Sequence, residues 1–517
     1  MFAIEFMKNK ENIVPFLFGI EKNPIHYSWI FYKYMDFALK NGYPIIADEA
    51  YFVNPSVYEK QNEFSFQNIV DGYNVLYEFK KPTDKDMKKV IQFPITKEEK
   101  EKVLSGFEDK EKAIIHILQS RDEKFEDMIL SKLRTIEEKY GKIVAVLSWT
   151  YFPSLEFCCQ QLGIQLITLE QTTFRPKGYR FKFGYFQFYN KYDSVRMDAD
   201  YQTFLQEFQD SNQYFNRKEL LALFLADDQL KWINHLNDQS EYDFGLSIGP
   251  DYDPLASAFC HMPVLNVLNE LKENFQVHQV LTRVHPMQKG IRKELEIFPQ
   301  DHSSSSLEWI LKCRRIISIG SNVAFEAMLL GKTSYVLGDN FPYHYGSITE
   351  LNQYEEKIAD LKYINYIVFG YYVPYSLMFD RDYILWRLTN PSVIEIYHYH
   401  LDYVMKEFGL SKKLFDMTFS QRLRTILETH PALKKKEITA FVTHHNHNLE
   451  EEIQQLHCEL SQQKTYYESR LAEVVANYEK EMNEQTEKYN QIINSKSWKV
   501  TKPLRFVTNH LAKSFKK

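Results

Sequence analysis

The sequence lacks the features that mark several common classes of protein. Its five cysteines form no CxxC pair and no metal-type cluster; they stand at positions 158, 159, 260, 313 and 458. This spacing argues against a disulfide framework and favours reduced thiols in a cytosolic protein. The net charge of −6 gives no sign of a general nucleic-acid binder. The phosphate-loop pattern GxxxxGK[ST] is absent as well.

Long apolar runs are also missing. No stretch reaches the roughly 18–20 apolar residues that a membrane-spanning helix needs. The first twenty residues carry no small-residue cleavage pattern of a signal peptide. We therefore expect a cytoplasmic protein that associates at most peripherally with the inner face of the cell membrane.

What the sequence does contain is an alternation of short apolar strands and helices. With 517 residues and 44% hydrophobic side chains, it is long enough for two globular domains. The pattern predicts an α/β fold with two Rossmann-like domains, 1–240 and 241–440, built on parallel sheets. The first domain has strands at 13–20, 43–50, 142–149 and 164–171, with helices at 26–42, 97–140 and 153–163. The second has strands at 243–249, 275–284, 314–320 and 333–339, with helices at 254–273 and 322–331.

The last part of the chain has a different character. Residues 447–492 repeat apolar side chains at steps of three and four, which predicts a coiled coil and a homo-oligomer. The alternative is a single helix folded back on the globular part. Residues 493–517 hold seven Lys or Arg and no acid, with Trp498 and Phe506 among their apolar residues. This composition favours an amphipathic tail on an anionic membrane surface over a disordered one.

Polar side chains stand where four predicted strands end, and ligands in open α/β sheets collect at such carboxyl edges. Glu170 closes one strand; it is a candidate base or carboxylate partner of a sugar, or else a surface group paired with Arg175. Asp251 follows another strand, together with Gly249 and Asp253, which equally fit a turn. His285 precedes Pro286 at a third, where it can neutralise or protonate a phosphate.

The fourth strand end is the most specific. An apolar strand runs into Gly320, Ser321 and Asn322, and a helix follows at once. Ser321 or Asn322 is a natural helix cap, and free backbone N–H groups there favour an anion. Backbone donors and His285 together predict phosphate binding without a metal ion or another cofactor.

These motifs resemble those of bacterial capsule polysaccharide biosynthesis glycosyltransferases. The resemblance rests on the HP pair and on strand–SxGSN–helix–EAMLLGK–strand–LGD over about 240–350. The resemblance implies a GT-B enzyme. The family includes Kdo transferases, and the layout of its site is similar to that of bacterial sialyltransferases. The resemblance places His285, Ser318, Ser321, Glu326 and Gly338 on the donor site, which holds the cytidine monophosphate of a CMP-sugar.

The same resemblance places Glu170 and Arg175 on an acidic E-[DE]-G motif, from which the sequence departs at Gln171 and Thr172. The terminal segment SKSWKVTKPLR also resembles a tail found on many surface-polysaccharide glycosyltransferases.

The sequence thus predicts a metal-independent glycosyltransferase that moves a sugar from a nucleotide sugar, CMP-linked and Kdo-like, to a capsule or surface glycan or glycolipid. Two alternatives stay open. One is a CDP-polyol phosphotransferase of the teichoic-acid type, and the other is a non-catalytic nucleotide-binding scaffold. The predicted catalytic residues are Glu170 and His285. Donor binding falls to Ser318, Gly320, Ser321, Asn322 and Glu326, and substrate binding to Arg175, Arg283 and Asp251.

Overall fold

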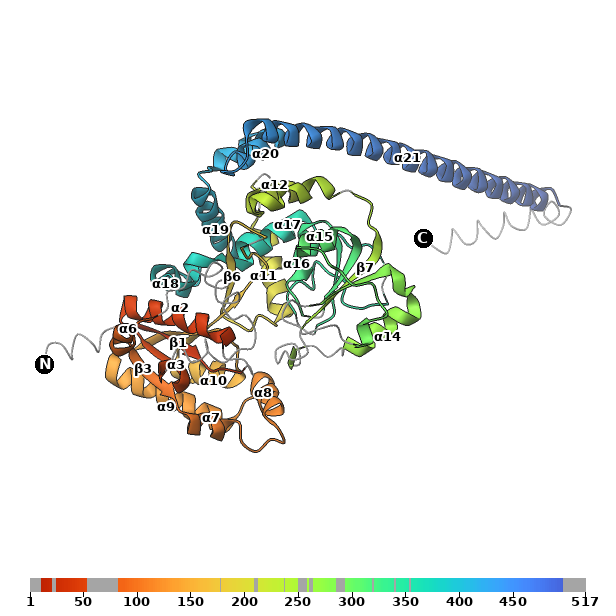
Figure 1. Ribbon diagram of the computed structural model, residues 1–517. Coiled ribbons are helices and arrows are strands. Elements are labelled where there is room, and N and C mark those ends of the chain that lie inside the picture. The colour runs from red at the N-terminus through yellow and green to blue at the C-terminus, as the bar shows by residue number, and fades with distance from the viewer. Residues whose placement is uncertain are drawn as a thin grey trace, which may run out of the picture. The chain divides into compact units, whose positions relative to one another are not determined.

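A computed structural model describes residues 11–20, 25–53, 82–176, 178–208, 213–236, 238–249, 258–259, 264–284, 293–318, 320–338, 341–352 and 355–495. The chain divides into two compact units, Met1–Thr439 and Ala440–Lys517, and each is considered by itself. The first unit contains two β-sheets with surrounding helices (Figure 1). The predicted α/β fold with parallel sheets is confirmed.

The larger sheet has seven strands in the order β11-β6-β5-β4-β1-β2-β3. The five strands from β5 to β3 are parallel, whereas β6 and β11 are antiparallel to their neighbours. The strand bounds are β1 Asn12–Leu17, β2 Pro44–Asp48, β3 Ile91–Ile95, β4 Ile143–Ser148, β5 Gln165–Gln171, β6 Phe183–Gln187 and β11 Tyr372–Pro374. Every residue of β1 is buried, as expected for a central parallel strand covered on both faces.

Helices cover this sheet, and Figure 1 shows α2 and α9 on different sides of β1. Their bounds are α2 Ile25–Asn41, α3 Glu49–Val53, α6 Asp84–Lys89, α7 Lys97–Val103, α8 Lys110–Gln119, α9 Glu123–Tyr140 and α10 Pro153–Leu162. The stretch predicted as one helical run over 97–140 is three helices. The side chains of Asp109 and Asp122 accept backbone hydrogen bonds and so begin α8 and α9 anew. Gly163 ends α10 in the left-handed conformation (φ 66°), which confirms the predicted C-cap.

The smaller sheet has four parallel strands in the order β10-β9-β7-β8. Their bounds are β7 Tyr242–Ile248, β8 Val280–Val284, β9 Cys313–Ser318 and β10 Thr333–Val336. The helices around it are α14 Val264–Asn274, η2 Val277–Gln279, η3 Lys293–Leu295, α15 Ser306–Leu311 and α16 Val323–Leu329. The strand predicted over 275–284 is therefore shorter, because its first part forms a 3-10 turn.

The segments that connect and follow the two sheets are mostly helical. They are α11 Ser194–Glu207, α12 Arg217–Phe224, η1 Asp227–His235, α17 Leu361–Asn365, the π-helix η4 Tyr366–Tyr371, η5 Tyr375–Phe379, α18 Arg381–Leu388, α19 Val393–Glu407, η6 Lys412–Asp416 and α20 Phe419–Leu427. Part of this C-terminal region returns to the larger sheet: β11 pairs with β6, and Met378 joins the core beneath. A Cβ on Gly184 would lie 1.9 Å from the Met378 sulfur and 3.0 Å from the Glu170 carbonyl oxygen, so a larger residue there would require the Met378 side chain to move.

The second unit consists, over its described residues, of the continuation of one helix, α21 Lys435–Asn494. Large apolar side chains lie exposed along it, Tyr467 at 66% and Leu471 at 65%. A helix is thus present where a coiled coil is predicted, while its pairing stays a prediction. The predicted tail lies outside the described residues beyond Ser495. In the described part of the chain, no helix has the length and hydropathy to cross a bilayer.

Candidate functional site

A cleft of about 670 Å³ opens between the smaller sheet and the loop that follows β5. The carboxyl ends of β7 and β8 and the starts of α15 and α16 form one side. The start of η1 and part of the loop after β5 form the other, with Thr173, Arg175, Pro176, Gly178 and Tyr179 as the lining residues of that loop. Five residues predicted from the sequence line it: Arg175, Arg283, Ser321, Asn322 and Glu326. The geometry thus brings together, at one strand-end cleft, residues more than 140 positions apart.

Glu326, in the first turn of α16, is the most deeply buried carboxyl group of the cleft, with 6% exposure. It accepts a hydrogen bond of 2.9 Å from the hydroxyl of Tyr179. The hydroxyls of Thr173 and Ser306 also act on this carboxyl group in the sense that lowers its pKa. Burial raises the pKa of Glu326, and these hydroxyls and Arg175 only partly offset that rise. Burial likewise raises the pKa of Tyr179, and the neighbouring Glu326 is the next cause of the rise. The phenol therefore stays protonated and acts as the hydrogen-bond donor to Glu326.

The Gly320–Asn322 loop is held from within. Gly320 has a φ of 74°, in the region that favours glycine. The Ser318 hydroxyl accepts from the Ser321 amide at 3.0 Å and donates to the Ser321 carbonyl at 3.0 Å. The Ser321 hydroxyl accepts from the Val323 amide at 3.4 Å. Two of the backbone N–H groups that we expected to be free for an anion are therefore already bonded to serine side chains.

Asn322 stands at the N-cap position of α16, but its side chain makes no capping bond. Its carbonyl oxygen accepts from the hydroxyls of Tyr185 at 2.8 Å and Tyr343 at 3.1 Å. Its amide nitrogen donates to the Gln171 carbonyl at 3.2 Å. Asn322 therefore ties the smaller sheet to β5 and β6 of the larger one. Gln171, where the sequence departs from the acidic motif, contributes a buried backbone contact to that tie.

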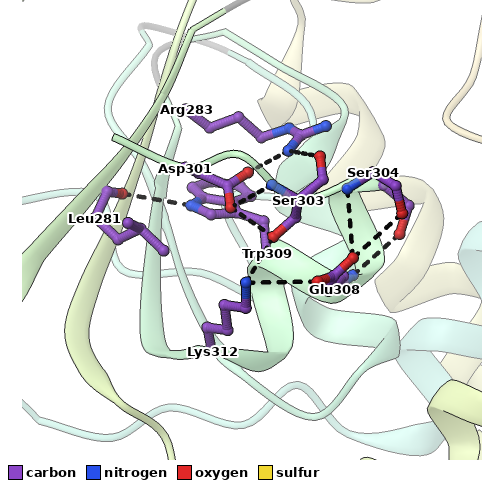
Figure 2. Close-up of polar contacts among 9 residues, drawn as sticks. Leu281, Arg283, Asp301, Ser303, Ser304, Glu308, Trp309 and Lys312 are labelled. Carbon is purple, nitrogen blue, oxygen red and sulfur yellow. Dashed lines mark hydrogen bonds and ion pairs between the residues drawn. The ribbon is translucent and has the colours of Figure 1, made fainter. Parts of the chain in front are cut away.

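Arg283, near the end of β8, forms an ion pair with Asp301 (Figure 2). The same terminal nitrogen donates to the Ser303 carbonyl at 3.2 Å. The Asp301 side chain is 1% exposed and that of Arg283 is 22% exposed. The buried carboxylate thus fixes an arginine that borders the cleft.

Arg175 also borders the cleft, but it is not paired with Glu170. Its Nε donates to the Thr172 carbonyl at 3.0 Å, and its own carbonyl accepts from the Tyr179 amide at 3.0 Å. The loop after β5 thereby turns back on itself and carries both Arg175 and Tyr179 to the cleft.

Glu170 lies in a second, much smaller cavity, which Trp149, Tyr185 and Lys191 also line. Its Oε2 forms a salt bridge of 2.9 Å with Lys191, and its Oε1 accepts a hydrogen bond of 2.9 Å from the Gln171 amide. The cavity measures about 10 Å³, close to the room that one water molecule needs. Since Tyr185 lines this cavity and bonds to Asn322 in the cleft, one hydrogen bond links the walls of the two spaces.

Two predicted residues, His285 and Asp251, lie outside the described residues. The structure adds residues that the sequence did not single out: Tyr179, Lys191, Asp301 and Ser306. The run of four serines at 303–306 was a visible signal for this side of the cleft. Among the described residues, no group of three His, Cys, Asp or Glu side chains has the geometry of a metal site.

Part of the chain is similar to a known family of enzymes. Residues 12–193 match the glycosyltransferase 99 family N-terminal domain. The chain therefore carries a glycosyltransferase-type domain, and this domain includes β1 to β6, Glu170 and Arg175. No curated protein matches the sequence.

Several solved structures are similar to the chain in part. KpsC from Thermosulfurimonas dismutans, described as a beta Kdo 2,7 transferase, is 15% identical with a TM-score of 0.30, over 47% of this chain and 81% of that one. A UDP-N-acetylglucosamine 2-epimerase from Rickettsia bellii is 10% identical with a TM-score of 0.26, over 77% and 99% of the two chains. At such low identities and scores, the likeness does not extend to substrate or activity.

Proposed function

We propose that the protein transfers a sugar from a nucleotide-activated donor, CMP-linked and Kdo-like, to a bacterial capsule or surface glycan. The observation that carries this proposal is the cleft that joins Arg175, Arg283 and Glu326 beside a glycosyltransferase-type domain. Its size is within the range of small-molecule sites, which span roughly 300–1,000 Å³. Two guanidinium groups suit a donor that bears a phosphate and a sugar carboxylate.

In this scheme, the cleft is the donor side of a GT-B enzyme. Arg175 and Arg283 bind the anionic groups of the donor. Glu326 accepts a hydrogen bond from a hydroxyl group of the nucleotide sugar, since it is the buried carboxyl group that lines the cleft. We retain His285 as the group that neutralises the leaving phosphate, a role that rests on the sequence alone. The scheme routes no step through a metal ion or cofactor.

Glu170 belongs to the acceptor side in this scheme. Its carboxylate faces a cavity with room for about one water molecule, which is also the room that one hydroxyl needs. We assign Glu170 as the base that takes the proton of the attacking acceptor hydroxyl. Lys191 then stabilises the carboxylate before the reaction and helps to release the proton afterwards.

The test is a pair of measurements on the purified full chain. Thermal shift with CMP, CDP and UDP ranks the nucleotides, because a ligand that binds only the folded state raises its melting temperature. We expect CMP to give the largest shift. Turnover is then measured with CMP-Kdo, CMP-sialic acid, UDP-sugars and CDP-glycerol. Transfer of glycerol phosphate with release of CMP would contradict the proposal and favour a polyol phosphotransferase, and no turnover with nucleotide bound would favour a scaffold.

We also propose that helix α21 pairs with a second copy of the chain. Exposed apolar residues follow one another at steps of four and three along it: Tyr467, Leu471, Val474, Tyr478, Met482, Tyr489 and Ile492, with Gln485 in the same series. The step of four from Tyr478 to Met482 follows another step of four, a stutter that unwinds a left-handed coil locally. Unpaired, such a stripe would leave large apolar side chains in water.

Light scattering on the full chain tests this pairing. The wild type should have at least twice the 61.7 kDa mass of one chain. Leu471→Asp should lower the mass toward one chain, while Ala476→Asp, off the stripe, should not. A wild type of single-chain mass would contradict the proposal.

The basic segment 493–517 is proposed, from sequence alone, to bind an anionic membrane surface. Sedimentation of the full chain with phosphatidylglycerol vesicles, but not with phosphatidylcholine vesicles, is the expected result. Equal recovery with both would remove this assignment.

A further inference from the structure

The guanidinium group of Arg283 is only partly used inside the protein. Its Nη1 pairs with Asp301 and donates to the Ser303 carbonyl, which accounts for both hydrogens of that nitrogen. The other three N–H groups, on Nη2 and Nε, make no hydrogen bond to any described residue. The side chain borders the cleft and is 22% exposed. The Nε and Nη2 edge of this planar guanidinium group is thus available to a ligand.

Asp301 is fixed from two sides. Its backbone amide donates to the Thr282 carbonyl at 2.8 Å, which holds the segment beside β8. Its Oδ1 accepts from the Ser303 amide at 3.0 Å and from the Ser303 hydroxyl at 2.5 Å (Figure 2). These hydrogen bonds fix the orientation of the Asp301 carboxylate, and the carboxylate in turn orients the plane of the Arg283 guanidinium group.

The surrounding charges cancel. Lys312 donates to the Ser303 hydroxyl at 2.9 Å and forms an ion pair of 3.5 Å with Glu308. Together with Arg283 and Asp301, this network has two cations and two carboxylates. An incoming anion is therefore drawn less by net charge than by correctly placed donors. Such a site favours two-point binding of an oxyanion, which a lysine ammonium does not reproduce.

We propose that Arg283 binds the oxyanion of the substrate in two-point fashion and that Asp301 is its positioning residue. This rests on the proposed function for the identity of the substrate. The oxyanion is the phosphate of the nucleotide or the carboxylate of the donor sugar, and both present two oxygens to the free edge of the guanidinium. Arg283 thereby separates anionic from neutral ligands in the cleft.

Calorimetric titration of the full-length protein tests this with four probes: pyrophosphate, CMP, cytidine and free Kdo. Arg283→Lys keeps the charge and the aliphatic stem but loses the fork. It should weaken binding of the oxyanion probes at least tenfold and leave cytidine unchanged. A loss for CMP identifies the phosphate as the ligand group, and a loss for Kdo alone identifies the sugar carboxylate. Arg314→Lys, at an exposed ion pair with Glu356, is the matched control and should bind every probe as the wild type does.

The positioning role has its own variants. Asp301→Asn should weaken the same oxyanion probes three- to tenfold without changing cytidine, a selectivity that general destabilisation would not produce. Should that variant not fold, Ser303→Ala removes one bond to Asp301 and should act in the same sense but less strongly. Unchanged binding of all probes by Arg283→Lys, or no oxyanion bound by the wild type, would overturn the inference.

The two proposals fail separately. Sugar transfer by the wild type, with probe binding insensitive to Arg283, would leave the proposed function and remove this inference. Oxyanion binding that depends on Arg283, with no sugar transferred from any donor, would do the reverse.

Discussion

Two carboxyl groups lie in adjoining spaces of very different kind. Glu170 lines a cavity of about 10 Å³ and forms a salt bridge with Lys191. Glu326 lines a cleft of about 670 Å³ and is surrounded by the hydroxyls of Tyr179, Thr173 and Ser306. The first has room for one small group beside a paired charge, and the second has room for a nucleotide beside a group whose pKa burial raises.

The difference in size fits the two separate roles that the sequence predicted, Glu170 as a catalytic group and Glu326 as part of the donor site. A small polar space next to a carboxylate suits a proton transfer from one hydroxyl. A wide cleft with two arginines suits binding of a larger anionic ligand. If this division is correct, substitution in one space should change turnover, and substitution in the other should change donor affinity.

The largest expected effect is from Glu170→Gln. The amide keeps the shape and the contact with the Gln171 amide but cannot act as a base. We expect kcat to fall roughly 10²–10⁴-fold, the usual contribution of a general base, with the donor affinity unchanged. Steady-state kinetics together with donor titration measures both quantities.

Lys191→Met is the companion variant, because it removes the salt bridge of Glu170 but leaves the carboxylate. Its kcat should fall less than that of Glu170→Gln. A Glu170→Gln enzyme with wild-type kcat would erase the proposed division between the two spaces.

Glu326→Gln should act on the other side of the comparison. A charged acceptor makes a stronger hydrogen bond than an amide by about 1 kcal/mol, so the dissociation constant of the nucleotide sugar should rise about fivefold. The kcat at saturating donor should stay within a few-fold of the wild type. Calorimetry with CMP and saturation kinetics check the two expectations, and a large fall in kcat at unchanged affinity would reverse the assignments.

The strand ends that border the site were predictable because parallel strands are short apolar runs. The sequence located β4, β5, β7 and β9 to within a few residues, and with them Glu170 and the loop before α16. The break of the 97–140 stretch was foreseeable too, since Asp109 and Asp122 are strong N-cap residues. Local chemistry sufficed for these features.

Partners of side chains were not predictable, because they come from distant segments. Tyr179 reaches Glu326 across 147 positions, and Lys191 replaces Arg175 as the partner of Glu170 through the β5–β6 pairing. The return of β11 to β6 joins segments far apart in the chain and has only three residues, too few for a periodic signal. Asn322 is of a residue type that commonly caps helices, but here its side chain makes no capping bond and instead accepts a hydrogen bond from Tyr185.

Tyr185→Phe tests the hydrogen bond that links the walls of the two spaces. It removes the donor to Asn322 and the contact with the Tyr343 hydroxyl. We expect the free energy of unfolding to fall by about 1 kcal/mol, the net value of a buried hydrogen bond. Tyr371→Phe is the control, since its buried hydroxyl has no hydrogen-bond partner among the described residues and its ring lies 5.5 Å from that of Tyr185. Equal losses in chemical denaturation would show that the link contributes nothing of its own.

The smallest expected effect is a pH dependence of stability that comes from Glu326. Burial raises its pKa in the folded state, so between its ordinary value and the raised one the folded chain holds a proton that the unfolded chain has lost. The contribution of Glu326 to stability is therefore full at low pH and declines as the pH rises through this window. Glu326→Gln does not titrate, so its melting temperature relative to the wild type should rise from pH 4.5 toward neutrality. Tyr179→Phe removes a hydrogen bond that lowers this pKa, and it should steepen the decline. A difference between Glu326→Gln and wild type that is flat with pH would mean that Glu326 is ionised as readily in the folded cleft as in the unfolded chain.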